Sequence, residues 1–385
     1  MEYLIGWWTN CAWLCITAAT NQYCADWIVA TASAIYPEWE VQTWQTWLMC
    51  VGVSLIALLL NLPGGFKLLS YISRSAVVII NVTALFMIIA LLVRANPKQS
   101  ASVVFVEVVN TSGWESLGTV FFLSMLPGLA CMGALDSALH LTDEVDNATK
   151  QVPQVMMGSF GLGALSGVIT IIVLGFCNIN PPALGNAPGG MALVQLFIDA
   201  YDSPALVLTT NVLFTICFAI ASFSCLTSWS RLYWSFSRHE MLPFYRWTAR
   251  LSSSDTLPIN ALILNTVLAN LLTLIKIGNT TAMNAILGSV KLFISCAFIP
   301  CFALLLWRGR HPLDPNRWLN LGTFWGPILN VIAITWCLFI SVWLCFPTHL
   351  PVKRESANYA AAVVVGATVI GVVYWFVVVS KKKLS

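Results

Sequence analysis

The sequence predicts an all-α protein built as a bundle of membrane-spanning helices, and three observations lead to this prediction. Of the 385 residues, 58% are hydrophobic and only 9% are charged, whereas a soluble domain carries about 25% charged residues. The apolar residues gather into stretches of about 20, the length that crosses a bilayer. The 17 Trp and 20 Phe residues fit the aromatic belts of membrane interfaces.

Ten stretches are long and apolar enough to span a membrane, and turn-forming residues separate them. Pro63-Gly64-Gly65 and Asn180-Pro181-Pro182 are two of these links. No soluble domain or low-complexity run interrupts the series, so residues 1–385 are expected to form one membrane domain. The expected spans cover residues 4–34, 44–62, 70–93, 116–139, 155–178, 204–229, 259–277, 282–307, 321–346 and 359–380.

The first expected span carries an unusual polar load for a helix in lipid. Thr17 and Asn21 lie near its middle, where polar side chains form hydrogen bonds between helices. Asp26 follows one turn later and is a candidate for coupling, as a proton relay, or for gating.

The distribution of Lys and Arg predicts that both termini are cytoplasmic. Alternate links and the C-terminus hold 13 of these residues, and the opposite links hold four. The sequon Asn110-Thr111-Ser112 then lies outside and is a glycosylation candidate, whereas the matching pattern at Asn147 lies inside and is expected to stay bare.

The fourth span is the best candidate for a binding site, because it contains Pro127-Gly128, then Gly133, then the acid Asp136. An interrupted helix in a bilayer exposes peptide N–H and carbonyl groups, which is tolerated only beside protein or a water-filled cavity. The alternative is a simple Pro/Gly kink with Asp136 close to the cytoplasmic water.

Other charged residues offer fewer signals. Lys291 lies midway along span 282–307, where a charge is costly unless it is paired or faces a cavity; it would then replace a coupling cation or bind a carboxylate. Glu144, within a cytoplasmic acidic cluster next to His140, is a candidate gate partner for Arg231 or Arg238. The four His are isolated, so no metal site is expected, and no phosphate-binding or nucleophile motif predicts a cofactor or an enzyme.

Several ordered motifs resemble the fungal amino-acid, choline and γ-aminobutyrate (GABA) permeases of the amino acid–polyamine–organocation superfamily. The first is ALDSALHLTDEV at 134–145, which is similar to the sixth-helix motif of that family. Further matches are SRLYWSFSR at 230–238, in the expected loop after the family's eighth helix, LPF at 242–244, LPINA at 257–261 and IGNTTAMNAI at 277–286.

The resemblance implies a LeuT-like bundle of two inverted five-helix repeats with two further helices. Placing 134–145 on helix six makes span 4–34 helix three, so the ten spans correspond to helices 3–12 and the first two helices are expected to be missing. The resemblance also implies a substrate site formed by Gly133, Ala134, Leu135 and Asp136, with Thr17 and Asn21 contributed by helix three. Relatives usually have Gly and an aromatic residue where this chain has Ala134 and Leu135, which weakens the case for choline, because aromatic faces bind quaternary ammonium groups.

The expected function is therefore secondary active transport of amino acids or related small amines, coupled to protons and working by alternating access. The alternative is a non-transporting remnant that acts as a membrane sensor or scaffold, or a truncated gene model. The expected location is the plasma membrane, with the vacuolar membrane as the second choice. Membrane lipid and a small substrate are the expected partners; the net charge of +3 gives no reason to expect nucleic acid.

Overall fold

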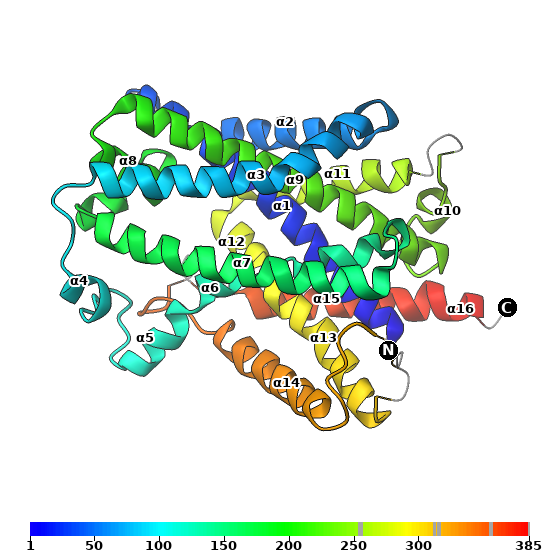
Figure 1. Cartoon of the computed structure of the whole chain (residues 1–385). Helices are drawn as coiled ribbons and strands as arrows, with labels where there is room; N and C mark the ends of the chain where they lie inside the picture. The colour runs from blue at the N-terminus through cyan, green and yellow to red at the C-terminus, as the bar shows by residue number, and fades with distance from the viewer. Residues whose placement is uncertain (253–256, 311–312, 314–316, 354–356, 384–385) are drawn as a thin grey trace.

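The computed structural model describes residues 1–252, 257–310, 313, 317–353 and 357–383, and it omits the side chains of residues 66, 130, 143, 144, 382 and 383. The described residues form helices joined by short links (Figure 1). In chain order the elements are α1 (Glu2–Ile35), α2 (Thr43–Asn61), α3 (Pro63–Arg94), α4 (Ala101–Phe105), α5 (Leu117–Ser124), α6 (Leu126–Cys131), the 3₁₀ helix η1 (Leu135–Glu144), α7 (Ala148–Cys177), the 3₁₀ turns η2 (Pro181–Asn186) and η3 (Pro188–Gly190), α8 (Ala192–Tyr201), α9 (Pro204–Arg238), α10 (Tyr245–Thr248), α11 (Ile259–Gly278), α12 (Thr280–Gly288), α13 (Val290–Trp307), α14 (Trp325–Trp343), α15 (Ala360–Tyr374), the π-helical turn η4 (Trp375–Val379) and α16 (Ser380–Lys383).

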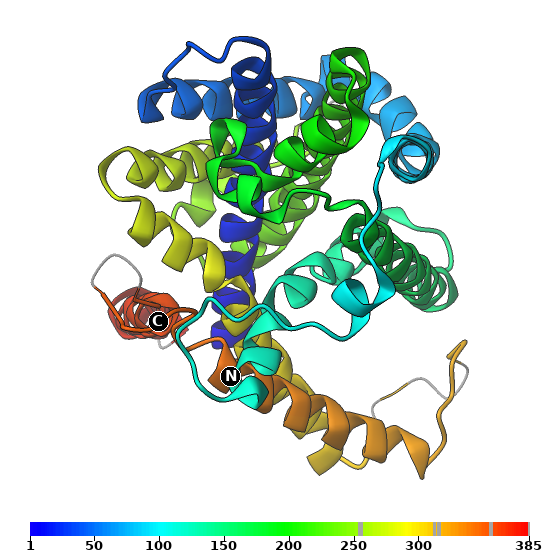
Figure 2. The same ribbon diagram turned by 90° about the vertical axis from the view of Figure 1, so that its left-hand side faces the viewer.

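Helix α1 runs through the centre of the bundle (Figure 2). It packs against α9, α13, α2, α11, α15 and α12, and within the described residues no other helix has as many buried residues. This position explains its polar composition, because a helix enclosed by protein can satisfy polar side chains with neighbouring helices rather than with lipid.

Within the described residues, eight helices are long and apolar enough to cross a membrane. The other two expected spans differ in kind. Helix α1 is continuous but too polar to be among the eight, and the fourth span is divided into α5, α6 and η1. The all-helical, polytopic prediction is confirmed, with eight clear spans in place of the ten expected.

Several helices extend beyond the expected spans, and α9 is the clearest case. The segment 230–238, expected to be a loop, instead continues α9 to Arg238. Side chains of this last part anchor the following segment: Tyr233 donates a hydrogen bond to the Pro243 carbonyl at 2.8 Å, and the Trp234 indole N–H donates to the Ala249 carbonyl at 3.1 Å. These hydrogen bonds to the following segment stabilise the last part of α9, which extends beyond the expected membrane span.

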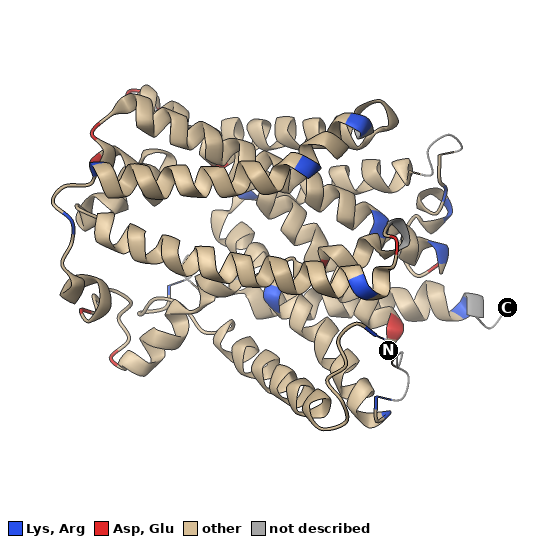
Figure 3. Ribbon diagram, viewed as in Figure 1, with Lys and Arg blue, Asp and Glu red and all other residues tan. Residues whose placement is uncertain are grey.

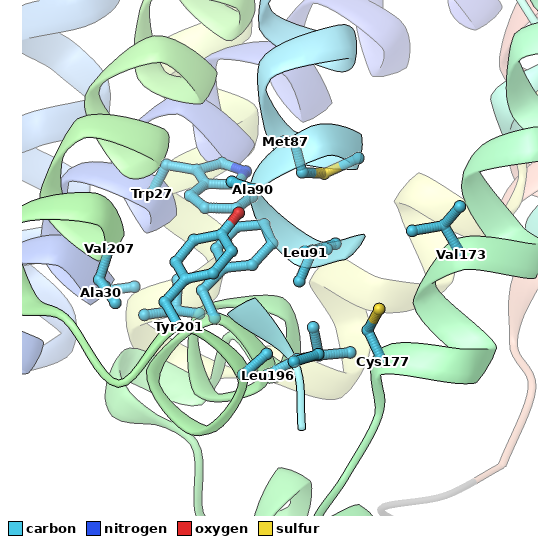
Figure 4. Packing of buried hydrophobic residues seen from close by; sticks show 14 residues of the cluster. Trp27, Ala30, Met87, Ala90, Leu91, Val173, Cys177, Leu196, Tyr201 and Val207 are labelled. Atoms are coloured by element: carbon cyan, nitrogen blue, oxygen red, sulfur yellow. The ribbon is translucent and has the colours of Figure 1, made fainter. Parts of the chain in front are cut away.

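An aromatic cluster fixes the end of α1 that lies away from the termini (Figure 4). Trp27 stacks on Phe214 of α9 with ring centroids 4.9 Å apart, and Phe197 stacks on Tyr201 of α8 at 5.3 Å. Leu91 of α3 is fully buried in the same cluster. Four elements are therefore held together by close side-chain packing, which drives the association of helices in lipid, and α8 is fixed against the bundle.

The two termini lie at the same end of the bundle, and the links that carry α4, α5 and α8 lie at the other (Figure 1). Lys and Arg gather toward the end with the termini, while the middle of the bundle is nearly free of charge (Figure 3). This arrangement matches the alternation of basic and poorly basic links in the sequence.

Candidate functional site

The fourth span is broken at the position that the sequence predicts. Helix α6 ends at Cys131, residues 132–134 are not helical, and the chain then resumes as the 3₁₀ helix η1. Ala134 adopts the left-handed conformation, with φ of 59°. The prediction of an interrupted helix around Gly133 is confirmed, and the alternative of a simple kink is wrong.

Ala134 is strained at this break. The left-handed conformation costs an L-residue about 1–2 kcal/mol, because its Cβ approaches the next carbonyl oxygen, and Gly is free of this cost. Such strain persists only where the surrounding structure fixes the backbone, and it concentrates at functional sites.

We expect the substitution Ala134→Gly to stabilise the protein by about 0.5–1 kcal/mol, since the relief of strain exceeds the greater freedom of Gly in the unfolded chain. Ala134→Val is expected to destabilise it, because a β-branched side chain is still less tolerant of a positive φ. Thermal unfolding of the detergent-solubilised protein measures both effects. Ala138→Gly in η1 is the matched control and should be neutral or destabilising, because Ala138 has no positive φ; equal effects at both positions would contradict the strain.

Asp136 lies just past the break and is buried, with 7% of its surface exposed. The Trp13 indole N–H of α1 donates a hydrogen bond to its Oδ2 at 3.1 Å, and His140 Nε2 lies 3.4 Å from the same oxygen. The Trp13 and His140 rings meet edge to face at 5.2 Å. A carboxylate, an imidazole and an indole thus form one compact group between η1 and α1.

A cavity of about 770 Å³ opens at the break. Gly133 and Ala134 line it from the broken span, Thr20 and Tyr23 from α1, and Lys291 from α13. Its volume is within the range of small-molecule sites, about 300–1,000 Å³. The remaining lining comes from α6, α9, α12 and the segments around 344–349 and 357–358.

The structure brings together only part of the predicted site. Gly133 and Ala134 line the cavity, whereas Leu135 and Asp136 do not. Thr17 and Asn21 are also absent from the lining, because they lie on another face of α1. Both are buried, and the Asn21 side-chain carbonyl accepts a hydrogen bond from the Ser222 hydroxyl of α9. For Asn21, the alternative role in holding helices together is the one observed.

Sequence reasoning missed three residues that the geometry brings to this region. Thr20 and Tyr23 line the cavity from α1, together with Ile16 and Ala19. The spacing of these four residues places them on one face of the helix. His140, expected to belong to a solvated acidic cluster, pairs with Asp136 instead. The four-residue spacing of Asp136 and His140 is the signal that could have identified this pair.

Asp26 belongs to a different location. It accepts hydrogen bonds from Lys276 Nζ of α11 at 3.0 Å and from the Gln22 amide at 2.8 Å. This pair borders a separate pocket of about 550 Å³, near the start of α2 and η3. Trp13 and Asp26 are 13 residues apart on α1, or about 20 Å along its axis, so Asp26 is remote from the break.

The two remaining gating candidates are only partly described. Arg231 is buried on α9, where its guanidinium lies 3.4 Å from both the Thr227 carbonyl and the Ser230 hydroxyl. Helix α9 packs against η1, the element that carries Glu144. The Glu144 side chain lies outside the described part of the structure, so the predicted contact with Arg231 stays a prediction. Arg238 instead lies over the Trp234 ring, 5.0 Å from its centroid.

Comparison with known proteins identifies the family. A family model described as amino acid permease matches residues 1–369. The chain belongs to the amino acid permease family. This confirms the resemblance inferred from the motifs, and it makes the protein a member of a transporter family rather than an enzyme. The family implies a LeuT-like fold.

Three relatives are 25–30% identical to this permease over the matched residues. It is 28% identical over 373 residues to a putative amino acid/polyamine transporter of Macrophomina phaseolina, covering 94% of the chain and 80% of the relative. It is 30% identical over 295 residues to an uncharacterized amino-acid permease of Schizosaccharomyces pombe, covering 75% and 53%. It is 25% identical over 366 residues to a choline transporter of Saccharomyces cerevisiae, covering 93% and 63%. The chain thus spans between half and four-fifths of the length of these relatives.

Proposed function

We propose that this permease is a secondary active transporter of amino acids or related small amines, which works by alternating access around the cavity at the helix break. The observation that carries the proposal is the coincidence of two features: a span interrupted at residues 132–134, and a cavity of about 770 Å³ bordered by that interruption. Discontinuous helices beside a mid-membrane cavity are the structural basis of substrate binding in many secondary transporters.

We also propose proton coupling, with Asp136 and His140 as the proton-binding pair. His140 Nε2 lies 3.4 Å from Asp136 Oδ2. The Trp13 indole N–H holds the same carboxylate by a hydrogen bond. A carboxylate and an imidazole can each take up and release a proton, so the pair offers a proton site beside the broken span. The relatives named as transporters of amino acids, polyamines and choline support the substrate class.

Uptake into proteoliposomes tests this function directly. The purified chain is reconstituted, and an inward proton gradient is imposed with labelled amino acids, GABA or choline outside. We expect accumulation of at least one labelled amino acid above that in protein-free liposomes, and its loss when a protonophore collapses the gradient. No accumulation of any probe, with correctly inserted protein, would overturn the proposal and favour a membrane sensor or scaffold.

For the orientation, we propose that both termini are cytoplasmic and that the protein resides in the plasma membrane. The support is the excess of Lys and Arg at the end of the bundle that carries the termini (Figure 3), since cytoplasmic links are enriched in these residues.

The two sequons give a test of this orientation. Asn110 is exposed between α4 and α5, at the end opposite the termini, whereas Asn147 precedes α7 at the end where the termini lie (Figure 1). We expect Asn110→Gln to increase the electrophoretic mobility of the protein from a glycosylating host by one glycan, and Asn147→Gln to leave it unchanged. A glycan on Asn147 would invert the proposed topology.

A further inference from the structure

The chemistry of the cavity lining bears on which substrates the permease accepts. Lys291 is the only Lys or Arg among the described lining residues, and no Asp or Glu is among them. The other polar lining residues are His349 and Thr, Asn and Tyr side chains. An empty cavity of this composition carries net positive charge, which attracts an anionic group and repels a cation.

Among the described residues, Lys291 has no partner for its charge, in contrast to Lys276. The Lys276 ammonium is paired with Asp26 at 3.0 Å. In the described part of the chain, the Lys291 ammonium has neither a hydrogen bond nor an ion pair. The Asp136 carboxylate is engaged by Trp13 and His140 and does not line the cavity. A charged lysine within a span is costly unless it meets a partner, and the carboxylate of a ligand in the cavity would supply one.

The lining also lacks the features that bind a permanent cation. Quaternary ammonium groups are held by cages of aromatic faces or by acids. The described lining provides a single phenol ring, Tyr23, and no acid. Leu135, where the family usually has an aromatic residue, adds no ring to the site. Choline and polyamines carry positive charge and no carboxylate. The Lys291 ammonium would therefore repel them, and they would not supply its counter-ion.

We propose that Lys291 binds the carboxylate of the substrate and restricts this permease to amino acids, excluding choline, polyamines and simple amines. This inference rests on the proposed function and narrows its substrate class. A charge-assisted hydrogen bond to a carboxylate contributes about ten- to hundredfold in affinity. Lys291 is then a specificity-determining residue, and the rest of the cavity selects among amino acids by shape.

The test compares two matched mixtures of probes on the purified full chain. One contains the common L-amino acids and GABA; the other contains the amines that result from removing their carboxyl groups. Choline and spermidine are tested separately, and ligand-induced thermal stabilisation reports binding. We expect the native protein to be stabilised by the amino acids and at least about tenfold more weakly by every cation without a carboxylate.

Substitutions then locate the effect. Lys291→Met should lose about tenfold or more of the affinity for amino acids while its weak affinity for amines stays equal or rises, and Lys291→Arg, which keeps the charge, should retain the preference for carboxylates. Lys67→Met, at an exposed position on α3, is the matched control and should behave as the native protein.

The native comparison alone keeps the inference testable if Lys291→Met does not fold. Binding of amines, choline or spermidine as tight as that of amino acids would overturn the role of Lys291 and leave the transport proposal intact. An unchanged preference in Lys291→Met would overturn it as well. Absence of binding by any probe, together with failed uptake, would overturn the proposed function itself and this inference with it.

Discussion

Replacing Asp136 with Asn is expected to reduce the initial rate of uptake by about 100-fold or more, with near-native amounts of protein in the membrane. The substitution keeps the size and the shape of the side chain but removes its charge. It thereby weakens the contacts with the Trp13 indole and the His140 imidazole. The Trp13 hydrogen bond to a charged group is worth about 1.5–3 kcal/mol, and its weakening, together with the loss of the charge beside His140, accounts for a loss of this size.

Two measurements separate this effect from misfolding. Surface labelling gives the amount of protein in the membrane, and thermal unfolding gives its stability. Glu115→Gln makes the same chemical change at an exposed site outside the bundle and should leave uptake unchanged. A rate for Asp136→Asn within about threefold of the native one would remove Asp136 from the transport mechanism, even with the helix break intact.

Replacing Trp13 with Ala should have the largest effect on stability. Its side chain is 1% exposed and is one of the largest that are fully buried, packed with Trp229 and Tyr233 of α9. Truncation of a buried Trp costs about 3–5 kcal/mol, and here it also removes a hydrogen-bond donor from buried Asp136. We expect a clear fall in the temperature of unfolding, measured in detergent, together with loss of uptake.

Trp13→Phe isolates the polar part of this effect. The ring still fills most of the space, so stability should fall much less than in Trp13→Ala, while the missing N–H leaves Asp136 with one partner fewer. We expect uptake to fall about tenfold. If Trp13→Phe transported at the native rate, the contact between α1 and the broken span would be only a packing contact.

The helix break could be predicted from the sequence because its cause is local. Pro127 has no backbone N–H to donate, and it follows the division between α5 and α6. An acid that follows Gly133 within an apolar span is costly unless the chain there meets protein or water. The break therefore appears where composition and motif both place it. The same local logic predicts the extent of α1, expected over 4–34 and observed from Glu2 to Ile35.

The orientation of α1 could not be predicted from its residues. In a helix that protein surrounds, polar side chains occur on faces that meet other helices as well as on faces that meet a cavity, so periodicity gives no unique inner face. Asn21 contacts Ser222 of α9, while the neighbouring Thr20 lines the cavity. Only the packing of α9 against α1 distinguishes these two positions.

Contacts between segments far apart in the chain could not be predicted from the sequence either. Asp26 and Lys276 are 250 residues apart and form an ion pair across α1 and α11. The position of Asp26 in the sequence suggests a proton relay. The position of Lys276, near the end of a span, suggests that its ammonium extends to the membrane–water interface. A single sequence shows which residues are charged and how far along a span they lie. It does not show which charged residues on different helices form ion pairs.

The central claim is that substrate occupies the cavity at the helix break, and Cys131 offers the most direct measurement of it. This residue ends α6, is exposed and lines the cavity. In a variant that keeps Cys131 and lacks the other 11 of its 12 cysteines, the rate of alkylation by a hydrophilic maleimide is measured with and without the amino-acid mixture. We expect the amino acids to slow the reaction in a saturable way, and their decarboxylated amines to leave it unchanged. An alkylation rate that no transported amino acid alters would contradict binding at the break.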